Sequence, residues 1–534
     1  MPRPPRAVLT AIVLLGFLVI VHGLAVPAYR LPDEPLHLDY ARASVDELGH
    51  PGFERRLAGD IAADLGTVRF GDRSRALTAA EAPPRDGRPL HDGDLPPGGV
   101  NQLVQHPPLY YLAIGVVDAA AEVVVPGYDD WPLTSRLGLL RLVQVIFVLP
   151  LPLLAWLTTR RLGLGDHAGI AAAVGLTLIP QFAHNASGLN NDNLLNLFIG
   201  IGTYLAVRIA TGDSGPRTAF AVGAVTGLAL LTKAFGAVLA PTVGLAYLVA
   251  VIHRHIPWRT GALRVAQSGL AATVLAGPWL VYAWNQTGNL QPRIPLVPEA
   301  QGFDPSVTVW FRGFTHRVVT RVWGDFGWFD VQINRTLAGV LTLVLMAVVA
   351  IGLWGRSRPE RLDRLVVGLP IGLLGLTLMY ASWSSHARTS VYPAIHGRYV
   401  FGAIVGIAVL VAAGLGTVLR RDRAVAPVLL ASGAAMQVLA FSVLLGFYWG
   451  PSGAGPLTRI DALLAWSPWA EVVTLGAFAA LALSAVVLAV QIATQITTGG
   501  DAIGAPSAPA APLPALAGDP TAEPTESPQQ AHAP

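Results

Sequence analysis

The residue types best suited to chemistry come just after the first apolar run, in LPDEPLH (31–37). Asp33 and His37 are one helical turn apart, so both lie near one stripe of a short amphipathic helix. A carboxylate there can take a proton from a hydroxyl, or can bind a divalent cation with Glu34 or Asp39. The alternative for Asp33 is an N-cap, a position where aspartate is favoured.

Two further polar positions follow in later segments. His106 precedes PPLYY (107–111), where the prolines fix an extended stretch and then permit a helix to start. Asp192 lies in the turn SGLNNDN (187–193), where the chain re-enters an apolar run. Alternatively, His106 only marks the position before a helix start, and Asp192 is a helix cap. If both segments share a face of the membrane with Asp33, they predict one polar site.

Two cations are candidates for holding a phosphate. Lys233 is the single lysine of the chain and stands between two apolar runs. It can extend to lipid headgroups, or lie in a cavity paired with an anion. Arg398, in HGRY (396–399), can form a bidentate contact to a phosphate or anchor the chain among headgroups.

Paired aromatic residues mark another segment, WGDFGW (323–328). Trp323 and Trp328 are candidates for stacking on carbohydrate. The alternative is plain anchoring in the headgroup zone, where tryptophan is enriched.

Composition sets the environment in which these residues must be positioned. The chain has 534 residues, of which 53% are hydrophobic and only 13% charged. Soluble proteins carry about 25% charged residues, so the sequence indicates a polytopic membrane protein. The chain has no cysteine, which excludes disulfides and thiolate chemistry. The net charge of +3 comes from dispersed arginines, so no basic module supports nucleic-acid binding.

About twelve apolar runs are long enough to be transmembrane helices. The predicted fold class is therefore all-α, a helix bundle with juxtamembrane helices in a long first external loop, 28–138. A further run, 109–125, carries Asp118 and Glu122 on one face and is predicted to lie in the interface rather than to span. The predicted spans are 7–29, 139–159, 167–186, 194–211, 218–233, 236–253, 263–283, 336–354, 365–382, 399–419, 424–447 and 471–492.

Arginine positions predict the orientation, since short basic loops stay cytoplasmic. If 109–125 does not span, the clusters at 160–161, 208–217, 254–259, 356–364 and 420–423 all become cytoplasmic. The candidate site residues then share the external face of a plasma membrane. Residues 1–495 form the membrane domain, and 496–534, rich in alanine and proline, are predicted to be a disordered cytoplasmic tail, with the N-terminus also cytoplasmic.

The order of these motifs resembles the glycosyltransferase C superfamily, which includes protein mannosyltransferases, aminoarabinose transferases and oligosaccharyltransferases. The motifs are DEPLH after the first span, HPPLYY before the next, an aspartate at the following outer turn, LTK at 231–233, WGDFGW and GRY. Within the superfamily they resemble a bacterial multi-span family of unknown function. The resemblance extends over about residues 10–450.

The resemblance implies a polyprenyl-phosphate-linked sugar as donor and a glycan, lipid or protein of the cell envelope as acceptor. By position, Asp33 matches the catalytic carboxylate of the superfamily, Glu34 its neighbour, and Asp192 the acidic residue of the second external loop. Lys233 and Arg398 match no superfamily-wide position and are assigned to lipid phosphate on charge and location. No cofactor is firmly implied, and a divalent cation is the one candidate, with no metal ligands assigned.

Two other functions remain open. A transporter or flippase for lipid-linked sugars or polysaccharide needs ionisable residues near the membrane midplane or broken helices. The predicted spans contain almost no ionisable residues, which favours an enzyme. A non-catalytic scaffold of a polysaccharide-synthesising complex is the third hypothesis, and the presence of Asp33, Glu34 and Asp192 argues against it.

Overall fold

The long apolar stretches fold into helices, because a backbone within lipid must satisfy its hydrogen bonds inside its own segment. The computed structural model describes residues 3–67, 98–295, 297–329, 331–355, 357–392, 395–450 and 453–498. Within them the only sheet is a two-stranded antiparallel hairpin, β1 (Asp325–Phe326) with β2 (Val331–Gln332). The predicted all-α membrane fold is thus confirmed.

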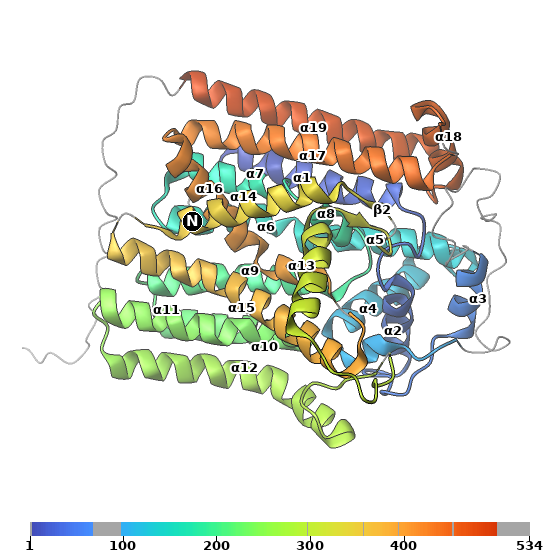
Figure 1. The fold of residues 1–534 in the computed structure, drawn as a ribbon, viewed down its shortest axis with the longest axis horizontal. Helices are drawn as coiled ribbons and strands as arrows, with labels where there is room; N and C mark the ends of the chain where they lie inside the picture. Colours follow the sequence, from blue (N-terminus) through green and yellow to red (C-terminus); the bar gives the residue numbers. More distant parts are fainter. Residues whose placement is uncertain are drawn as a thin grey trace, which may run out of the picture. The chain divides into compact units, whose positions relative to one another are not determined.

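Most of the long helices lie side by side and roughly parallel to one another, as Figure 1 shows. Their bounds are α1 (Arg6–Ala25), α2 (Glu34–Asp46), α3 (Gly59–Thr67), η2 (Gln102–Gln105), α4 (Leu109–Val124), η3 (Tyr128–Asp130), α5 (Leu133–Val148), α6 (Pro150–Arg161), α7 (Gly165–Gly175), α8 (Pro180–Ala186), α9 (Asn191–Ala210), α10 (Pro216–Thr232), η4 (Ala234–Val238), α11 (Leu239–His253), α12 (Trp258–Thr287), α13 (Val307–Trp323), α14 (Arg335–Leu353), α15 (Arg358–Thr389), η5 (Gly397–Ala403), α16 (Ile404–Leu419), α17 (Asp422–Tyr448), α18 (Pro456–Trp466) and α19 (Glu471–Thr498).

Ten helical segments of the described chain are long and apolar enough to cross a membrane. The other two predicted spans differ in form. Residues 216–232 make a shorter apolar helix, α10. The predicted span 167–186 is broken into α7 and α8, because Pro180 begins a new helix after residues 176–179. Helix α4, expected in the interface, is not among the ten.

Burial separates inner from outer helices. The span 397–419 and helix α9 are 72% buried, whereas α12, α14 and the span 471–495 are 17% buried. The outer helices expose apolar side chains such as Leu270, Leu343 and Leu483, as expected of a surface facing lipid. Helices α9 and α16 therefore form the rigid centre on which polar residues at the helix ends can be held.

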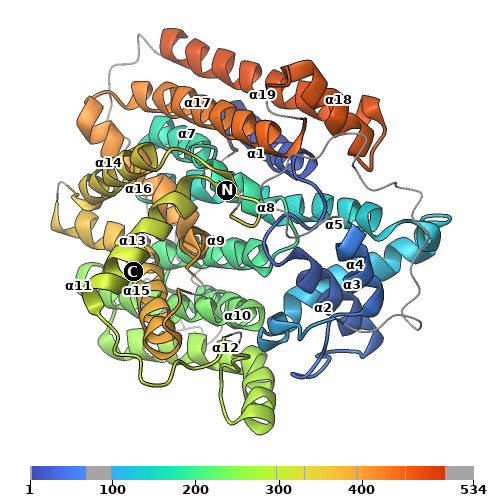
Figure 2. The same cartoon turned by 45° about the vertical axis from the view of Figure 1, so that its right-hand side comes forward.

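One end of the bundle is covered by α2, α3 and α4, which lie together in both views (Figures 1 and 2). We call it the capped end. Helices α2 and α4 pack closely because Gly115 has no side chain: a Cβ there would lie 2.2 Å from the Ala41 carbonyl oxygen. Asp39 of α2 accepts hydrogen bonds from Arg55 and Asn101, and so it fixes the segments that carry these two residues to α2.

The chain divides into two units, residues 1–493 and 494–534. Every helix and strand except the last residues of α19 belongs to the first unit. The predicted disordered tail, 496–534, lies almost entirely outside the described residues and stays a prediction.

Candidate active site

Four charged side chains from distant parts of the sequence meet at the capped end. We call Asp33, Asp192, Lys233 and Arg398 the central cluster. Arg398 Nη2 donates to Asp33 Oδ2 at 2.6 Å, and its Nε lies 3.4 Å from Asp192 Oδ2. Lys233 Nζ donates to Asp192 Oδ1 at 2.5 Å. Two carboxylates and two cations thus form one chain of ion pairs.

The backbone at Asp33 directs its carboxylate away from a capping role. Asp33 precedes α2 in the left-handed region, with φ 64° and ψ 8°, and its side chain makes no cap hydrogen bond. Helix α2 instead begins with Glu34 and Pro35, and proline is favoured in the first turn. The carboxylate of Asp33 is therefore available to Arg398.

Asp192 is held by the start of α9, and here too another residue is the cap. The Asn190 side chain accepts a hydrogen bond from the backbone N–H of Asp192 at 2.9 Å. Asp192 lies in the first turn, where the helix dipole favours a negative charge. Its side chain is 4% exposed and faces Lys233.

Lys233 ends α10 and lies inside the protein rather than among headgroups. Its side chain is 6% exposed, and Nζ lies 4.5 Å from the centre of the Tyr399 ring. A buried ammonium requires a paired anion, which Asp192 supplies. The anion-paired alternative for Lys233 is the one that the structure adopts.

Arg398 bridges both carboxylates and retains unused donor capacity. It lies at the start of η5, close to α13, because a Cβ at Gly397 would be 2.3 Å from the Arg321 carbonyl oxygen. Its Nη1 is buried and has no hydrogen-bond partner among the described residues. A buried donor without a partner is costly, so this atom is suited to a ligand oxygen such as a phosphate oxygen.

Three histidines surround the central cluster. His37 stacks on Tyr111 with ring centres 5.7 Å apart, and His396 lies 5.3 Å from the Tyr399 ring. Burial lowers the pKa of His37, His106 and His396 well below the usual value, and the charges of Arg398 and Lys233 lower it further. These imidazoles are therefore neutral at pH 7, so any hydrogen bond that they donate comes from a neutral ring.

The three depressed pKa values predict acid instability. In the unfolded chain these histidines bind protons near pH 6.5, whereas in the folded protein they stay neutral. The free energy of unfolding therefore falls as the pH drops below about 6.5, and these groups do not change it above that pH. Each histidine contributes up to about 1.4 kcal/mol per pH unit in that window. Thermal unfolding of His106→Gln should show a smaller decline below pH 6.5 than wild type.

His167→Gln, near the opposite end of the bundle, is the control and should follow the wild-type profile. A wild-type melting temperature that stays flat from pH 7 to about 5 would contradict the neutral histidines.

Glu34, the other predicted catalytic residue, is placed differently. Its two carboxylate oxygens each accept a hydrogen bond of 2.7 Å from Arg141, and its side chain is fully buried. Arg141 also donates to the carbonyl oxygens of Gly23, Val26 and Pro27, at the end of α1. The structure thus gives Glu34 a structural partner that fixes α5 to the turn before Asp33.

The two tryptophans are also committed to the fold. Trp323 is buried and donates its indole N–H to Thr342 of α14 at 2.9 Å. Trp328, beyond β1, donates to the Tyr29 carbonyl oxygen at 2.9 Å. Trp328 therefore fixes the hairpin against the segment leading to Asp33. Only Trp328, which is partly exposed, retains a surface on which a sugar could stack.

Several residues that support the site were not singled out from the sequence. Arg141 lies within an apolar run, and Gln144 accepts hydrogen bonds from Tyr110 and Asn193. Arg321 pairs with Asp325 and donates to the Ile395 carbonyl oxygen. For Arg141 and Gln144 the available signal was the cost of a polar residue inside a predicted span, whereas Arg321 lies outside the predicted spans and carried no such signal.

A divalent cation would need Asp33 together with Glu34 or Asp39. The structure directs Glu34 to Arg141 and Asp39 to Arg55 and Asn101, so these carboxylates do not converge. Within the described residues no group of three histidine, aspartate or glutamate side chains is arranged to hold an ion. The described residues therefore do not fit a metal site.

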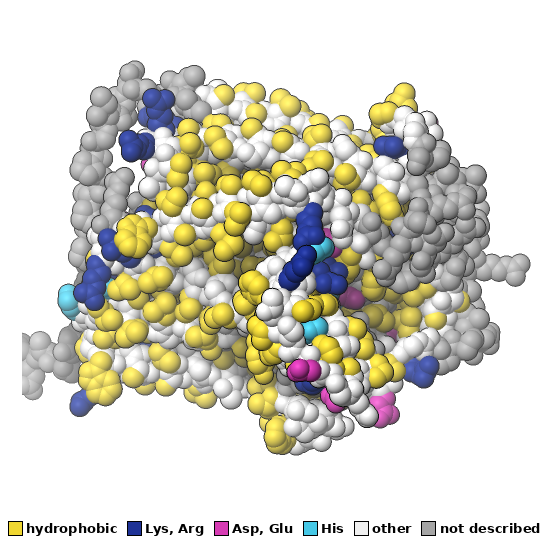
Figure 3. Space-filling view, in the orientation of Figure 1, with side chains coloured by type: hydrophobic (Ala, Val, Ile, Leu, Met, Phe, Trp, Pro, Cys, Tyr) yellow, Lys and Arg dark blue, Asp and Glu magenta, His cyan; other side chains and the backbone are white. Residues whose placement is uncertain are grey.

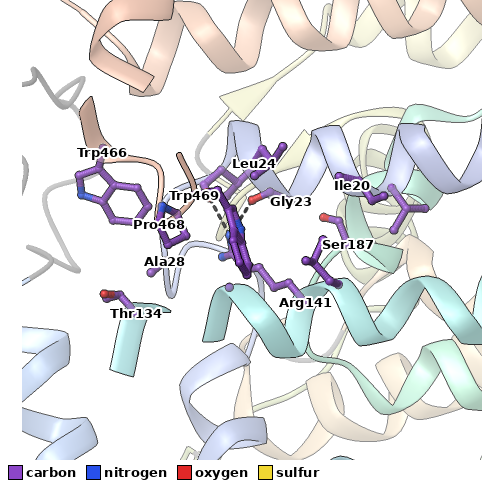
Figure 4. Close-up of a pocket in the computed structure, with 14 residues that line it drawn as sticks. Ile20, Gly23, Leu24, Ala28, Thr134, Arg141, Ser187, Trp466, Pro468 and Trp469 are labelled. Atoms are coloured by element: carbon purple, nitrogen blue, oxygen red, sulfur yellow. Dashed lines mark hydrogen bonds between the residues drawn. The ribbon is translucent and has the colours of Figure 1, made fainter. Parts of the chain in front are cut away.

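A narrow pocket lies behind Arg141, between α1, α5 and the segment 466–469 (Figure 4). Its empty volume is about 440 Å³, including open solvent, and its lining is mostly apolar. Figure 4 shows Trp469 and Pro468 facing Arg141 and Gly23. None of the four residues of the central cluster lines this pocket, so it is separate from the candidate active site.

A comparison with protein families agrees with the resemblance that the sequence motifs indicate. The family model described as dolichyl-phosphate-mannose-protein mannosyltransferase matches residues 135–282. A comparison with curated proteins finds no match.

Three solved structures align with the chain. ArnT from Cupriavidus metallidurans in the apo state is 15% identical, with a TM-score of 0.42 over 90% of this chain and 77% of that one. The same protein bound to undecaprenyl phosphate is 14% identical, with a TM-score of 0.39 over 83% and 78%. Arabinosyltransferase EmbB from Mycobacterium smegmatis is 13% identical, with a TM-score of 0.36 over 91% and 41%.

The family match covers α5 to α12, which carry Asp192 and Lys233, and it falls within a multi-span helical membrane protein. Together with the ordered motifs, it confirms the resemblance of this chain to the glycosyltransferase C superfamily.

Proposed function

We propose that the protein is an integral membrane glycosyltransferase that moves a sugar from a polyprenyl-phosphate donor to an acceptor of the cell envelope, whether glycan, lipid or protein. The family match supports the reaction class. The central cluster supports the site, because it combines carboxylates for an acceptor hydroxyl with cations for a phosphate.

The observation that carries the proposal is the position of Arg398 between two carboxylates, with Nη1 unpartnered among the described residues. Before substrate binds, Arg398 and Asp33 neutralise each other in a buried site. A donor phosphate then competes for Arg398, and Oδ2 of Asp33 becomes available to an acceptor proton. Donor binding would in this way prepare the base.

The transfer step follows from those positions. Asp33 accepts the proton of the acceptor hydroxyl while the hydroxyl oxygen attacks the anomeric carbon of the donor sugar. The bond between that carbon and the phosphate oxygen breaks, and the electron pair leaves with the polyprenyl phosphate. Arg398 and Lys233 stabilise the negative charge that develops there. Asp192 holds Lys233 in place through its ion pair.

The capped end is proposed to face the outside of a plasma membrane. The arginines at 160–161, 254–259 and 420–423 all lie at helix ends opposite it, and short basic loops remain cytoplasmic. Figure 3 shows dark blue side chains gathered at that opposite end. The donor would then be a lipid-linked sugar already on the external leaflet.

One observation favours the transporter alternative. The break between α7 and α8 lies beside buried polar groups, where His22 contacts Gln437 at 2.9 Å and His184 accepts from the Gly327 N–H. Broken helices with buried polar residues occur in transporters. The charged residues of the central cluster nevertheless lie at helix ends, which suits chemistry at a membrane surface.

The test is the compound that accumulates when the protein is absent. We expect a gene-deleted cell to accumulate the sugar-loaded polyprenyl phosphate on the external leaflet, together with an under-glycosylated envelope component. Wild-type protein should restore the normal lipid pool and Asp33→Asn should not. Accumulation on the cytoplasmic leaflet instead would indicate a flippase and contradict the proposal.

A further inference from the structure

Helix α13 carries a row of basic side chains outside the central cluster. Arg312, His316, Arg317 and Arg321 follow helical spacing and line an open cleft with an empty volume of about 1000 Å³, part of which is open solvent. We call these four residues the basic stripe. Arg335, at the start of α14, lies near His316 and adds positive charge. Among the described residues that line the cleft, Asp325 is the single acidic one.

The positive charge of the cleft is only partly neutralised. Arg321 pairs with Asp325 at 3.1 Å, and Arg317 stacks on Tyr392 at 4.3 Å from the ring centre. The exposed Arg312 guanidinium has no hydrogen bond or ion pair with any residue that the structure describes. A cleft with excess guanidinium charge matches an anionic ligand such as a phosphate.

The basic stripe also borders the lipid-facing surface. Helix α13 runs across the direction of α12 and α14 (Figure 1), and Figure 3 shows dark blue and cyan side chains over it, next to a broad yellow field. Val309 lines the cleft and is exposed, and α13 and α14 expose further apolar side chains: Phe311, Val340 and Leu343. An occupant with an anionic head and an apolar chain would match both surfaces.

The cleft adjoins the central cluster through the segment before η5. Arg321 donates to the Ile395 carbonyl oxygen, two residues before Gly397, whose α-carbon lies against Arg321. Burial lowers the pKa of His396, which lies between Ile395 and Gly397 in the sequence, and the charges of Arg398 and Arg321 lower it further. Residues 395–397 therefore connect Arg321 of the basic stripe to Arg398 of the central cluster.

We infer that the basic stripe binds the phosphate of the lipid-linked donor at the membrane surface, before that phosphate reaches Arg398 and Lys233. The inference rests on the proposed function and adds an entry site to it. The link from Arg321 to residues 395–398 favours the donor over a bulk phospholipid, because it joins the cleft to the proposed reaction centre.

The test measures binding of undecaprenyl phosphate to the full-length protein in phosphatidylcholine nanodiscs. We expect Arg312→Gln/Arg317→Gln to weaken binding at least about tenfold, because charge-assisted contacts are lost. Arg312→Lys/Arg317→Lys should recover part of it by retaining the charge. Arg420→Gln/Arg421→Gln, which removes two exposed arginines at the opposite end, should bind like wild type.

Transfer assays add a second readout. The glutamine double variant should need a higher donor concentration for half-maximal rate. Its rate should fall less at saturating donor than at low donor concentration, as expected for a binding defect. Unchanged binding, or equal loss in the control, would overturn the inference. Displacement of undecaprenyl phosphate by equimolar phosphatidylglycerol would assign the stripe to bulk lipid and also overturn it.

The outcomes separate this inference from the proposed function. If wild type transfers sugar and the double variant binds and transfers normally, the entry site is wrong and the function stands. If wild type binds undecaprenyl phosphate through the stripe but transfers no sugar with any donor, the function is wrong and the stripe stands. If wild type does not bind undecaprenyl phosphate, both are overturned.

Discussion

Replacing Asp33 by asparagine is expected to lower sugar transfer at least about a hundredfold while the protein inserts and folds normally. Asparagine cannot accept the acceptor's proton, and it cannot neutralise Arg398. Asparagine fits the backbone conformation at this position, because Asp33 has φ 64° and asparagine is among the residues that adopt the left-handed region most readily. The measurement is the rate of transfer per folded molecule in nanodiscs.

Asp46→Asn is the matched control, since Asp46 ends the same helix and is exposed. It should transfer sugar at the wild-type rate. If Asp33→Asn also retains near-normal transfer, Asp33 is not the base, and the amide oxygen must be tolerated. Loss of that residual transfer on addition of a chelator would show that a metal ion activates the acceptor hydroxyl, and would contradict the conclusion that the described residues do not fit a metal site.

Replacing Glu34 by glutamine is expected to affect stability rather than catalysis. The substitution leaves the Arg141 guanidinium buried without a counter-charge, and breaking such a pair costs about 3–5 kcal/mol. Thermal unfolding of the solubilised protein should show a large loss of stability. The molecules that remain folded should transfer sugar at nearly the wild-type rate, because Glu34 lies outside the central cluster.

Two comparisons make this prediction specific. Glu47→Gln removes a half-exposed partner of Arg55 and should cost at most about 1 kcal/mol. The double variant Glu34→Gln/Arg141→Met should lose less stability than the sum of the two single variants, because neither charge is then left unpaired. Normal stability of Glu34→Gln with abolished transfer would restore the catalytic role first expected for this residue.

Sequence reasoning located the central cluster because its members stand at the ends of apolar runs. Asp33, Asp192, Lys233 and Arg398 each follow or precede a stretch whose length predicts a span. The alternation of spans then places all four at the same membrane face. The fold class follows from the length of the same apolar runs, and the structure confirms it.

The partners of individual side chains could not be read from the sequence. Asp33 and Glu34 are neighbours, yet the backbone at Asp33 is left-handed and their carboxylates have different partners. Asp33 pairs with Arg398, 365 residues away, and Glu34 pairs with Arg141, 107 residues away. The break between α7 and α8 was also not predicted, although Pro180, Gln181 and His184 interrupt the apolar stretch 167–186 and proline often begins a helix. The partners of Asp33 and Glu34 depend on tertiary packing, whereas the helix break has a local signal in Pro180.

The central claim is that a bond between sugar and phosphate is broken at the capped end. It is tested by reconstituting the full-length protein in sealed vesicles with a labelled polyprenyl-phosphate sugar and an acceptor extract. We predict that label appears in the acceptor as free polyprenyl phosphate is released in equal amount, and that Asp33→Asn abolishes both. Movement of intact lipid-linked sugar between leaflets, with no release of polyprenyl phosphate, would contradict the account.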